Sequence, residues 1–458
     1  MKNSDSPKRK ARIFYARTDE FWRRGEKYAF LDEKQHVGNV EWQELQPDTK
    51  HNWLTEGMRD EFETFIPIGS KEAKADAQVN TKTIFKTYGR GVATSRDAWA
   101  YNFDADVLEE NIKRTIEIYN EQVFKWSRSA NKNESIDDFV VYDTGKIAWS
   151  RDLKLDLRRG KIAQFSGEKI RNSLYRPFTK SHLFFDRVLN EEVYVFPSIF
   201  PTPRTQQENR VICVPSGGSA QIAFFISDKI MDLNFFAGST PVQCFPFFTY
   251  NEDGTHRREN ITDWALAEFR AHYGDKSIEK WDIFHYVYAV LHHPVYRERY
   301  AANLKRELPR IPYAPDFRGF AGAGARLAEL HVHYEQQPEY PLEKIEQPNA
   351  ALDWRVEKMR LSKDRTRIVY NDFLTLAGVP AEAFGYRLGN RSALEWVIDQ
   401  YQVTTDRRSG ITNDPNRSDD PQYIVRLVGQ VITVSLETVS IVRALPDLGV
   451  RPDNVSSD

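Results

Sequence analysis

Residues 146–187 read KIAWSRDLKLDLRRGKIAQFSGEKIRNSLYRPFTKSHLFFDR, and we call this segment the basic stretch. It holds 11 Lys or Arg against 4 Asp or Glu, a local charge of +7 in a chain whose formal net charge is −2. Aromatic residues such as Trp149 and Phe165 are interleaved with the cations. That pattern is typical of a phosphate-facing surface, but an isolated charge run is more often a solvated face. The basic stretch alone leaves both interpretations open.

The length of 458 residues predicts roughly two to four domains. The chain is 40% hydrophobic and 13% aromatic, which is ample for packed cores and argues against global disorder. Because 64 Lys and Arg nearly balance 66 Asp and Glu, any nucleic-acid surface must be local. The two cysteines, Cys213 and Cys244, stand inside apolar runs and are predicted to be buried side chains without a bridge. The sequence shows no signal peptide or membrane-spanning run, which predicts a cytoplasmic protein.

The hydrophobic pattern predicts a mixed α+β protein of several domains. An amphipathic helix follows Asp104, because Leu108, Ile112 and Ile116 recur at helical spacing. Short apolar runs bounded by Gly and Pro between 139 and 250 predict strands, and the period then changes to that of four helices between 263 and 334. Apolar runs 423–428 and 431–442 predict closing strands, after a helix over 392–402. The predicted division is 1–102 (the tail of a methyltransferase-like domain), 103–135 (a helical spacer), 136–334 (a target-recognition body with a mixed sheet and a helical second half), 335–349 (a linker) and 350–458 (a small α/β supporting domain).

Catalytic motifs are missing from the sequence. An adenine methyltransferase needs an Asn/Asp-Pro-Pro-aromatic loop to hold the flipped base, and no such loop occurs. There is no Walker A motif for ATP either. Phe317 to Gly324 resembles a cofactor turn by its letters, but its place favours the entry of a helix. The sequence therefore predicts a chain that is not catalytic alone.

Several sequence blocks resemble one protein family. The core of the basic stretch, Ser173 to Phe178, resembles the YRPF signature of large adenine-specific DNA methyltransferases, at the start of the part that reads the target. Further blocks agree in order and wording: 93–103, 149–151, 244–246, 259–264, 304–312 and 389–396. Together they are similar to the C-terminal specificity region of Type ISP restriction–modification enzymes. Those enzymes join a nuclease, a helicase-like ATPase, an adenine methyltransferase and a target-recognition domain in one polypeptide.

The resemblance implies the sequence-specific DNA-recognition part of a restriction–modification enzyme of phage defence. It implies double-stranded DNA as a partner, possibly with a separately encoded helicase/methyltransferase portion, and no membrane. No cofactor is expected in this chain, because S-adenosylmethionine and ATP/Mg belong to the upstream domains. The alternative is a protein-docking scaffold subunit that does not read bases. The residues predicted to contact phosphate are Arg151, Arg158, Arg159, Lys161, Lys169, Arg171, Arg176, Lys180 and Arg187, and those predicted to read base edges are Arg407, Arg408, Asn413 and Asn416.

Overall fold

The computed structural model describes residues 11–19, 22, 24–48, 51–75, 82–129, 135–216, 222–236 and 241–450. The chain splits into two compact units, Met1–Met58 and Arg59–Asp458. In the first unit a two-stranded antiparallel sheet pairs Ile13 with Leu45, and none of the unit's described residues is buried. Its elements are β1 (Ile13–Tyr15), α1 (Arg24–Lys34), η1 (Val37–Asn39) and β2 (Gln43–Leu45).

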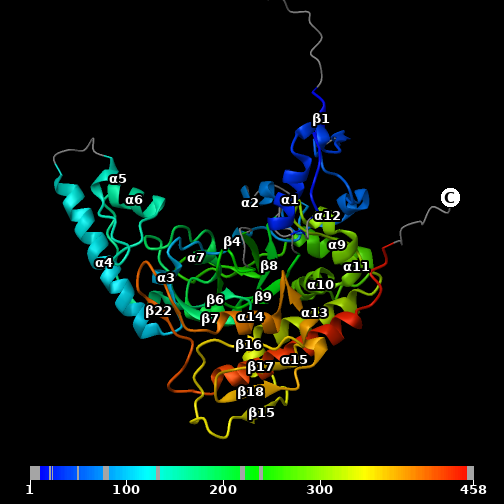
Figure 1. The fold of residues 1–458 in the computed structure, drawn as a ribbon. Helices are drawn as coiled ribbons and strands as arrows, with labels where there is room; N and C mark the ends of the chain where they lie inside the picture. Colours follow the sequence, from blue (N-terminus) through cyan, green and yellow to red (C-terminus); the bar gives the residue numbers. More distant parts are fainter. Residues whose placement is uncertain are drawn as a thin grey trace, which may run out of the picture. The chain divides into compact units, whose positions relative to one another are not determined.

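Two four-stranded sheets form the centre of the second unit (Figure 1). The first has the order β10-β6-β7-β5 and the second the order β4-β11-β8-β9. Cys213 and Cys244 are opposite each other in the second sheet and are free thiols, as predicted. The strands are β4 (Gly89–Arg90), β5 (Tyr101–Asn102), β6 (Ile170–Arg176), β7 (Thr179–Phe184), β8 (Val211–Pro215), β9 (Phe225–Ser227), β10 (Ile230–Met231) and β11 (Val242–Pro246).

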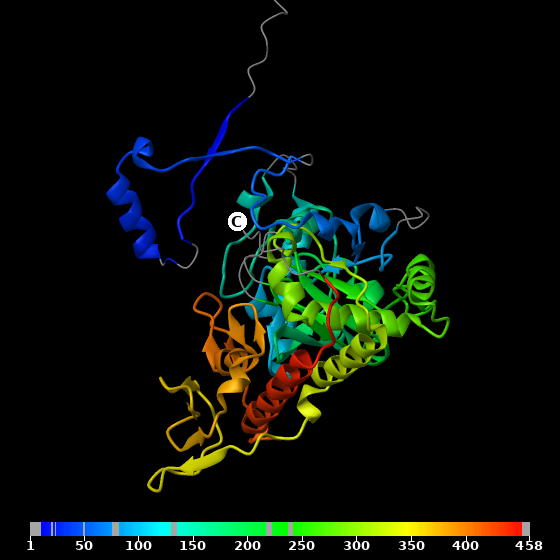
Figure 2. The same cartoon turned by 90° about the vertical axis from the view of Figure 1, so that its right-hand side faces the viewer.

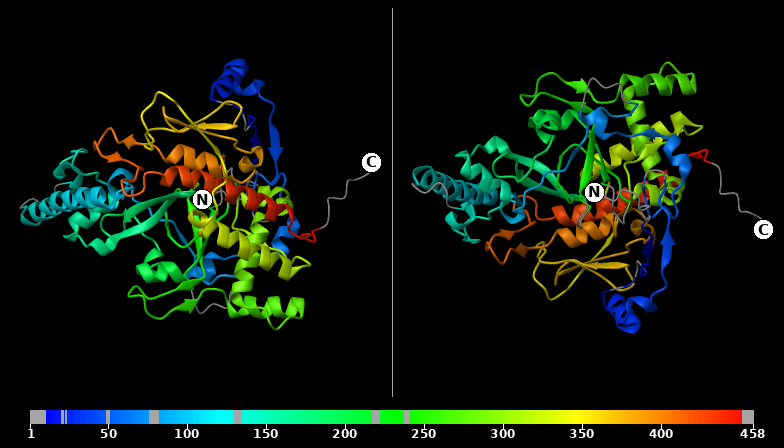
Figure 3. Two further views of the ribbon diagram at one scale, coloured as in Figure 1. Left: turned by 90° about the horizontal axis from the view of Figure 1, so that it is seen from below. Right: turned by 90° about the horizontal axis from the view of Figure 1, so that it is seen from above.

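A long helix, α4 (Ala105–Arg128), packs with α5 (Ile136–Phe139) and α6 (Arg151–Arg158), and we call these three helices the arm. The arm stands at one side of the two sheets (Figures 1 and 3). The predicted stripe of α4 is buried, with Leu108 at 0% and Ile112 at 2% exposure. Asp104 caps the helix by accepting from the backbone N–H groups of Asp106 and Val107. The helical spacer predicted from the sequence is thus confirmed as a helix.

The second half of this unit is helical from residue 263 to 332, as predicted. The segment 317–324 starts a helix, capped by Asp316, and is not a cofactor turn. The helices are α9 (Asp263–Tyr273), α10 (Lys280–His292), α11 (Pro294–Arg299), α12 (Ala301–Leu304) and α13 (Phe317–Val332). The shorter elements of the unit are η2 (Asp60–Thr64), β3 (Ile66–Pro67), α2 (Lys71–Ala75), α3 (Asp97–Ala100), η3 (Gly167–Lys169), α7 (Phe196–Ile199), α8 (Pro203–Glu208), β12 (Phe248–Thr249), β13 (Arg258–Glu259) and β14 (Arg310–Ile311).

The C-terminal elements pack onto the same core as the central sheets. Phe178 and Leu394 belong to one hydrophobic cluster, so residues after 349 do not form a core of their own. A third sheet has the order β15-β18-β17-β16 and lies beside α15 (Figure 2). The elements are η4 (Tyr334–Gln336), β15 (Glu343–Glu346), β16 (Arg360–Leu361), β17 (Arg367–Val369), β18 (Leu374–Ala377), η5 (Ala381–Phe384), β19 (Arg387–Leu388), β20 (Arg391–Ser392), α14 (Ala393–Gln400), β21 (Thr404–Thr405), β22 (Thr412–Asn413) and α15 (Tyr423–Arg443).

Three sequence predictions of local structure are wrong. The predicted linker 335–349 contains β15, whose residues pair with β18. The predicted strand at 139–142 is instead the end of α5 followed by a loop. The two predicted closing strands are the single helix α15, because burial among neighbouring elements overrides the strand preference of Val and Ile. By length and composition α15 would also pass for a membrane span, contrary to prediction, but 61% of its apolar window is buried inside the protein.

Candidate nucleic-acid interface

The YRPF motif of the basic stretch lies at the turn between β6 and β7, where it makes structural contacts. The Tyr175 hydroxyl donates to Asp97 Oδ2 over 2.9 Å. Arg176 Nη1 lies 2.6 Å from Asp232 Oδ1, and the guanidinium stacks 3.9 Å from the centre of the Tyr175 ring. Phe178 is fully buried with a φ of 58°. The motif therefore fastens the β6–β7 turn to two neighbouring segments, and Arg176 is not placed to contact phosphate.

Arg171 is also an internal residue, with 5% exposure. Its guanidinium donates to Gln206 Oε1 (2.8 Å) and to the carbonyl oxygens of Phe200 (3.2 Å) and Pro201 (3.3 Å). Burial lowers the pKa of Arg171 to about 10. The prediction that Arg171 contacts phosphate is wrong, because all its donors face protein acceptors inside the fold.

Three other cations of the basic stretch are paired with carboxylates. Lys169 lies 2.7 Å from Asp186 Oδ2, and Lys180 lies 2.5 Å from Glu335 Oε2. Arg187 lies 2.5 Å from Glu252 Oε1, with 57% of its side chain exposed. Each pair cancels its charge locally, so these cations contribute less to an anion-binding surface than their number implies. Their predicted contact with phosphate stays a prediction.

The free positive charge of the basic stretch gathers at α6 in the arm. Arg158 is exposed, and its guanidinium has no bond to any described residue. Arg159 (3.5 Å) and Lys161 (2.8 Å) share one carboxylate, that of Asp156, which leaves an excess of positive charge. Arg151 is 79% exposed beside Asp152. These four predicted residues therefore lie on one solvent-facing part of the arm.

A buried arginine that the sequence analysis did not select holds α6 in place. Arg96 donates to the carbonyl oxygens of Ala148 (3.1 Å) and Leu189, and to the Ser150 hydroxyl. Ser150 is the N-cap of α6 and accepts from the Leu153 backbone N–H over 3.4 Å. Burial lowers the pKa of Arg96 to about 10. The only sequence signal for this role is the place of Arg96 in the 93–103 block.

Two further predicted arginines lie on the β21–β22 hairpin. Arg407 and Arg408 are exposed in its turn, and no guanidinium contact to a described residue is present for either. Asp406 shapes the turn by accepting from the backbone N–H groups of Arg408 (3.1 Å) and Ser409 (2.7 Å). The Thr144 hydroxyl donates to the Arg408 carbonyl oxygen over 3.4 Å. The hairpin turn thus lies against the arm, next to the segment that leads into α6.

The predicted base-reading asparagines are occupied within the chain. Asn413 Oδ1 accepts from the Phe103 backbone N–H (2.8 Å) near the start of α4. Asn416 closes a two-way bond with the Val356 backbone, at 2.8 and 2.9 Å. Both amides fix the root of the hairpin, so the prediction that they read base edges is wrong for this conformation.

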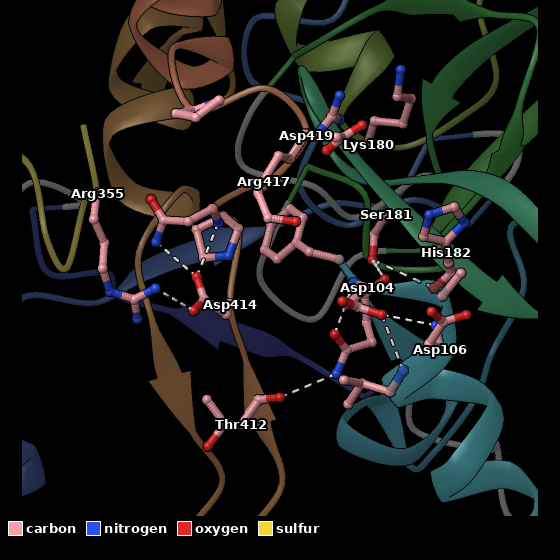
Figure 4. Close-up of a pocket in the computed structure, with 18 of the residues that line it drawn as sticks. Asp104, Asp106, Lys180, Ser181, His182, Arg355, Thr412, Asp414, Arg417 and Asp419 are labelled. Atoms are coloured by element: carbon pink, nitrogen blue, oxygen red, sulfur yellow. Dashed lines mark hydrogen bonds and ion pairs between the residues drawn. The ribbon is translucent and has the colours of Figure 1, made fainter. Parts of the chain in front are cut away.

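A polar cavity of about 900 Å³ opens beside this root (Figure 4). Arg417 and His182 line it, together with Asp104 at the start of α4. The Arg417 guanidinium stacks 3.3 Å from the centre of the Tyr423 ring. Burial lowers the pKa of His182, and the nearby Arg417 and Lys180 charges lower it further, so its ring is neutral at pH 7. No pattern in the sequence brought these residues together, because they come from segments more than 200 positions apart.

Comparisons with known proteins agree on one family. A sequence model of the Type ISP C-terminal specificity domain matches residues 83–427. No curated protein matches the chain. Among solved structures, a nuclease-deletion mutant of the Type ISP restriction–modification enzyme LlaGI in complex with a DNA substrate mimic has a TM-score of 0.83 at 34% identity, covering 98% of this chain and 40% of that one.

Two further solved structures give the same result. The DrdV–DNA complex has a TM-score of 0.84 at 34% identity, covering 96% of this chain and 44% of that one. The ATP-dependent Type ISP restriction–modification enzyme LlaBIII bound to DNA has a TM-score of 0.81 at 28% identity, covering 96% and 28%. This chain therefore spans less than half the length of each of these proteins. The family model covers most of its residues, and the chain belongs to the Type ISP C-terminal specificity domain family.

Proposed function

We propose that this chain recognises a sequence in double-stranded DNA for a Type ISP restriction–modification enzyme. The observation that carries the proposal is the joining of two groups of exposed arginines, on α6 and on the β21–β22 hairpin, by the contact between Thr144 and Arg408. The similar structures of LlaGI, DrdV and LlaBIII are complexes with DNA or a DNA mimic, which supports the same partner here.

The two groups would have different tasks. Arg151, Arg158, Arg159 and Lys161 lie on and just after a helix, and cations of that kind suit the phosphate backbone. Arg407 and Arg408 project from a two-stranded hairpin, a shape that the major groove admits, and arginine pairs well with the acceptor edge of guanine. In this proposal α6 supplies affinity and the hairpin supplies sequence preference.

The first unit would attach this chain to the catalytic part of the enzyme, as the tail of a methyltransferase-like domain. None of its described residues is buried, yet Phe14 (47% exposed) and Trp42 (44%) border an open apolar hollow with Ile13 and Val37. An exposed apolar surface of this kind marks an interface. The relatives are more than twice as long as this chain, so the missing surface would be their remaining portion. In the proposal, methyl transfer and ATP hydrolysis belong to that portion.

Titration with duplex DNA at several salt concentrations tests the function. If Arg158, Arg159 and Lys161 face phosphates, changing all three to Ala removes up to three contacts. Each lost contact lowers the slope of log K against log salt by about 0.9 and weakens binding to all sequences alike. Arg171 is left out of the variant because it is buried.

A matched control removes three cations that are each paired on their own helix. These are Lys113 with Glu109 (2.5 Å), Lys125 with Glu121 (2.5 Å) and Arg204 with Glu208 (3.3 Å). The control variant loses the same charge, so its slope should stay close to that of the wild type. Binding of duplex DNA that is equally steep in all three proteins would exclude α6 from the interface. Binding to a protein partner that ignores salt, with no DNA binding, would favour the docking-scaffold alternative.

A further inference from the structure

A second cavity, of about 280 Å³, lies between the central sheet and the root of the β21–β22 hairpin. One wall comes from α3, β5 and β6, with Asp97, Tyr101 and Tyr175. The opposite wall comes from the end of α14 and the hairpin, with Asp399 and Asp406. The cavity is distinct in its lining from the larger one around Arg417, although Phe103 and Ser181 border both.

The charge of this lining has one sign. Its three carboxylates are Asp97, Asp399 and Asp406, and no Lys, Arg or His borders the cavity. The Arg391 guanidinium approaches Asp399 from outside the lining, at 3.3 Å, and Asp399 keeps 41% of its side chain exposed. Carboxylates around a partly enclosed space repel anions and attract cations, since the local dielectric constant is lower than that of water.

Aromatic groups and one unsatisfied hydroxyl complete the cavity. The rings of Tyr101 and Tyr175 lie 4.9 Å apart, and Phe103 adds a third ring to the lining. Tyr101 is 3% exposed, and its hydroxyl oxygen is buried without a hydrogen-bond partner among the described residues. A buried polar atom without a partner costs folding free energy and calls for an explanation such as a missing ligand.

We propose that this cavity binds a small organic cation of the aliphatic amine class. An ammonium group donates hydrogen bonds to carboxylates and to a tyrosine oxygen, and aromatic faces attract organic cations. A bare metal ion would need several oxygen ligands converging on one point, and no group of three or more His, Cys, Asp or Glu among the described residues could hold one. The volume suits a molecule of a few heavy atoms, near the lower end of ligand pockets. This binding site goes beyond the proposed DNA recognition and does not depend on it.

Calorimetric titration of the whole chain with 1,4-diaminobutane, without DNA, tests the site. The neutral isostere 1,4-butanediol and MgCl₂ at equal ionic strength serve as ligand controls. We expect one diamine per chain, a rise in melting temperature with diamine concentration, and no response to the diol. Asp399→Asn should weaken binding by about tenfold or more, because it removes a charge-assisted hydrogen bond.

The matched control is Asp419→Asn, which removes the same charge from the lining of the larger cavity. It should bind the diamine within about twofold of the wild type. Circular dichroism confirms that each variant is folded, and Asp399 is exposed enough for the change to be tolerated. No diamine binding, binding of the diol as well, or equal weakening by both variants would overturn the proposal. DNA titration of the same proteins, without diamine, reports separately on the proposed function.

Discussion

Two hairpins of this protein each carry two arginines, and the structure uses them in opposite ways. On β6–β7, Arg171 and Arg176 are turned inward to the carbonyl groups, Gln206 and Asp232. On β21–β22, Arg407 and Arg408 stand in solvent with no side-chain partner among the described residues. The first hairpin belongs to the basic stretch that dominates the sequence, while the second lies in a loop of mixed charge.

The difference shows that a count of cations does not locate an anion-binding surface. Taking a guanidinium out of water is expensive unless acceptors surround it, and Arg171 and Arg176 have such acceptors. Those acceptors use the donors that a phosphate would need. Exposed arginines keep their donors free, so the β21–β22 hairpin and α6 are the better candidates for contact with DNA.

The largest expected effect is on the β6–β7 hairpin. Arg176→Ala should lower the free energy of unfolding by about 3–5 kcal/mol, because Asp232 is left buried without its partner. Denaturant unfolding of wild type and variant measures the change. A loss below about 1 kcal/mol would contradict the structural role, since surface substitutions have effects of that size.

The opposite hairpin should affect recognition while leaving stability unchanged. The double variant Arg407→Ala and Arg408→Ala should reduce the preference for the target site by about 1–3 kcal/mol, the discrimination of a good bidentate arginine contact. Competition between target and non-target duplexes measures this preference once the target sequence is known. If affinity fell equally for all sequences, the two arginines would be phosphate contacts.

A smaller effect is expected at the root of the β21–β22 hairpin. Asn413→Ala removes the acceptor of the Phe103 backbone N–H and should cost about 1 kcal/mol of stability. Thermal melts detect a loss of this size. Asn416→Ala offers a comparison, because its amide bonds to Val356 within the C-terminal part. A stability equal to that of the wild type would show that the hairpin root does not hold the start of α4.

The smallest expected effect completes the comparison. Arg158→Ala should change the free energy of unfolding by less than about 0.5 kcal/mol, because the side chain is exposed and has no partner among the described residues. The same unfolding experiment as for Arg176→Ala serves here. A loss as large as that of Arg176→Ala would mean that the arm depends on this arginine for its fold.

The sequence by itself determined the family, the helix α4 and the helical second half, because these depend on local patterns. The period of Leu108 and Ile112 and the cap at Asp104 are set within a few residues of the chain. Long blocks of similar wording identified the specificity domain, and the exposed arginines of α6 and of the β21–β22 hairpin were among the residues selected.

Only the tertiary structure decided which charges are free and which segments share a core. Gln206 lies 35 residues from Arg171 and Asp232 lies 56 from Arg176, so nothing near either arginine in the sequence indicates its burial. Likewise, α15 is a helix because it is packed among distant elements, although its Val and Ile residues favour strands. Long-range contacts balance desolvation against pairing, and that balance places the cationic surface on α6 and the β21–β22 hairpin.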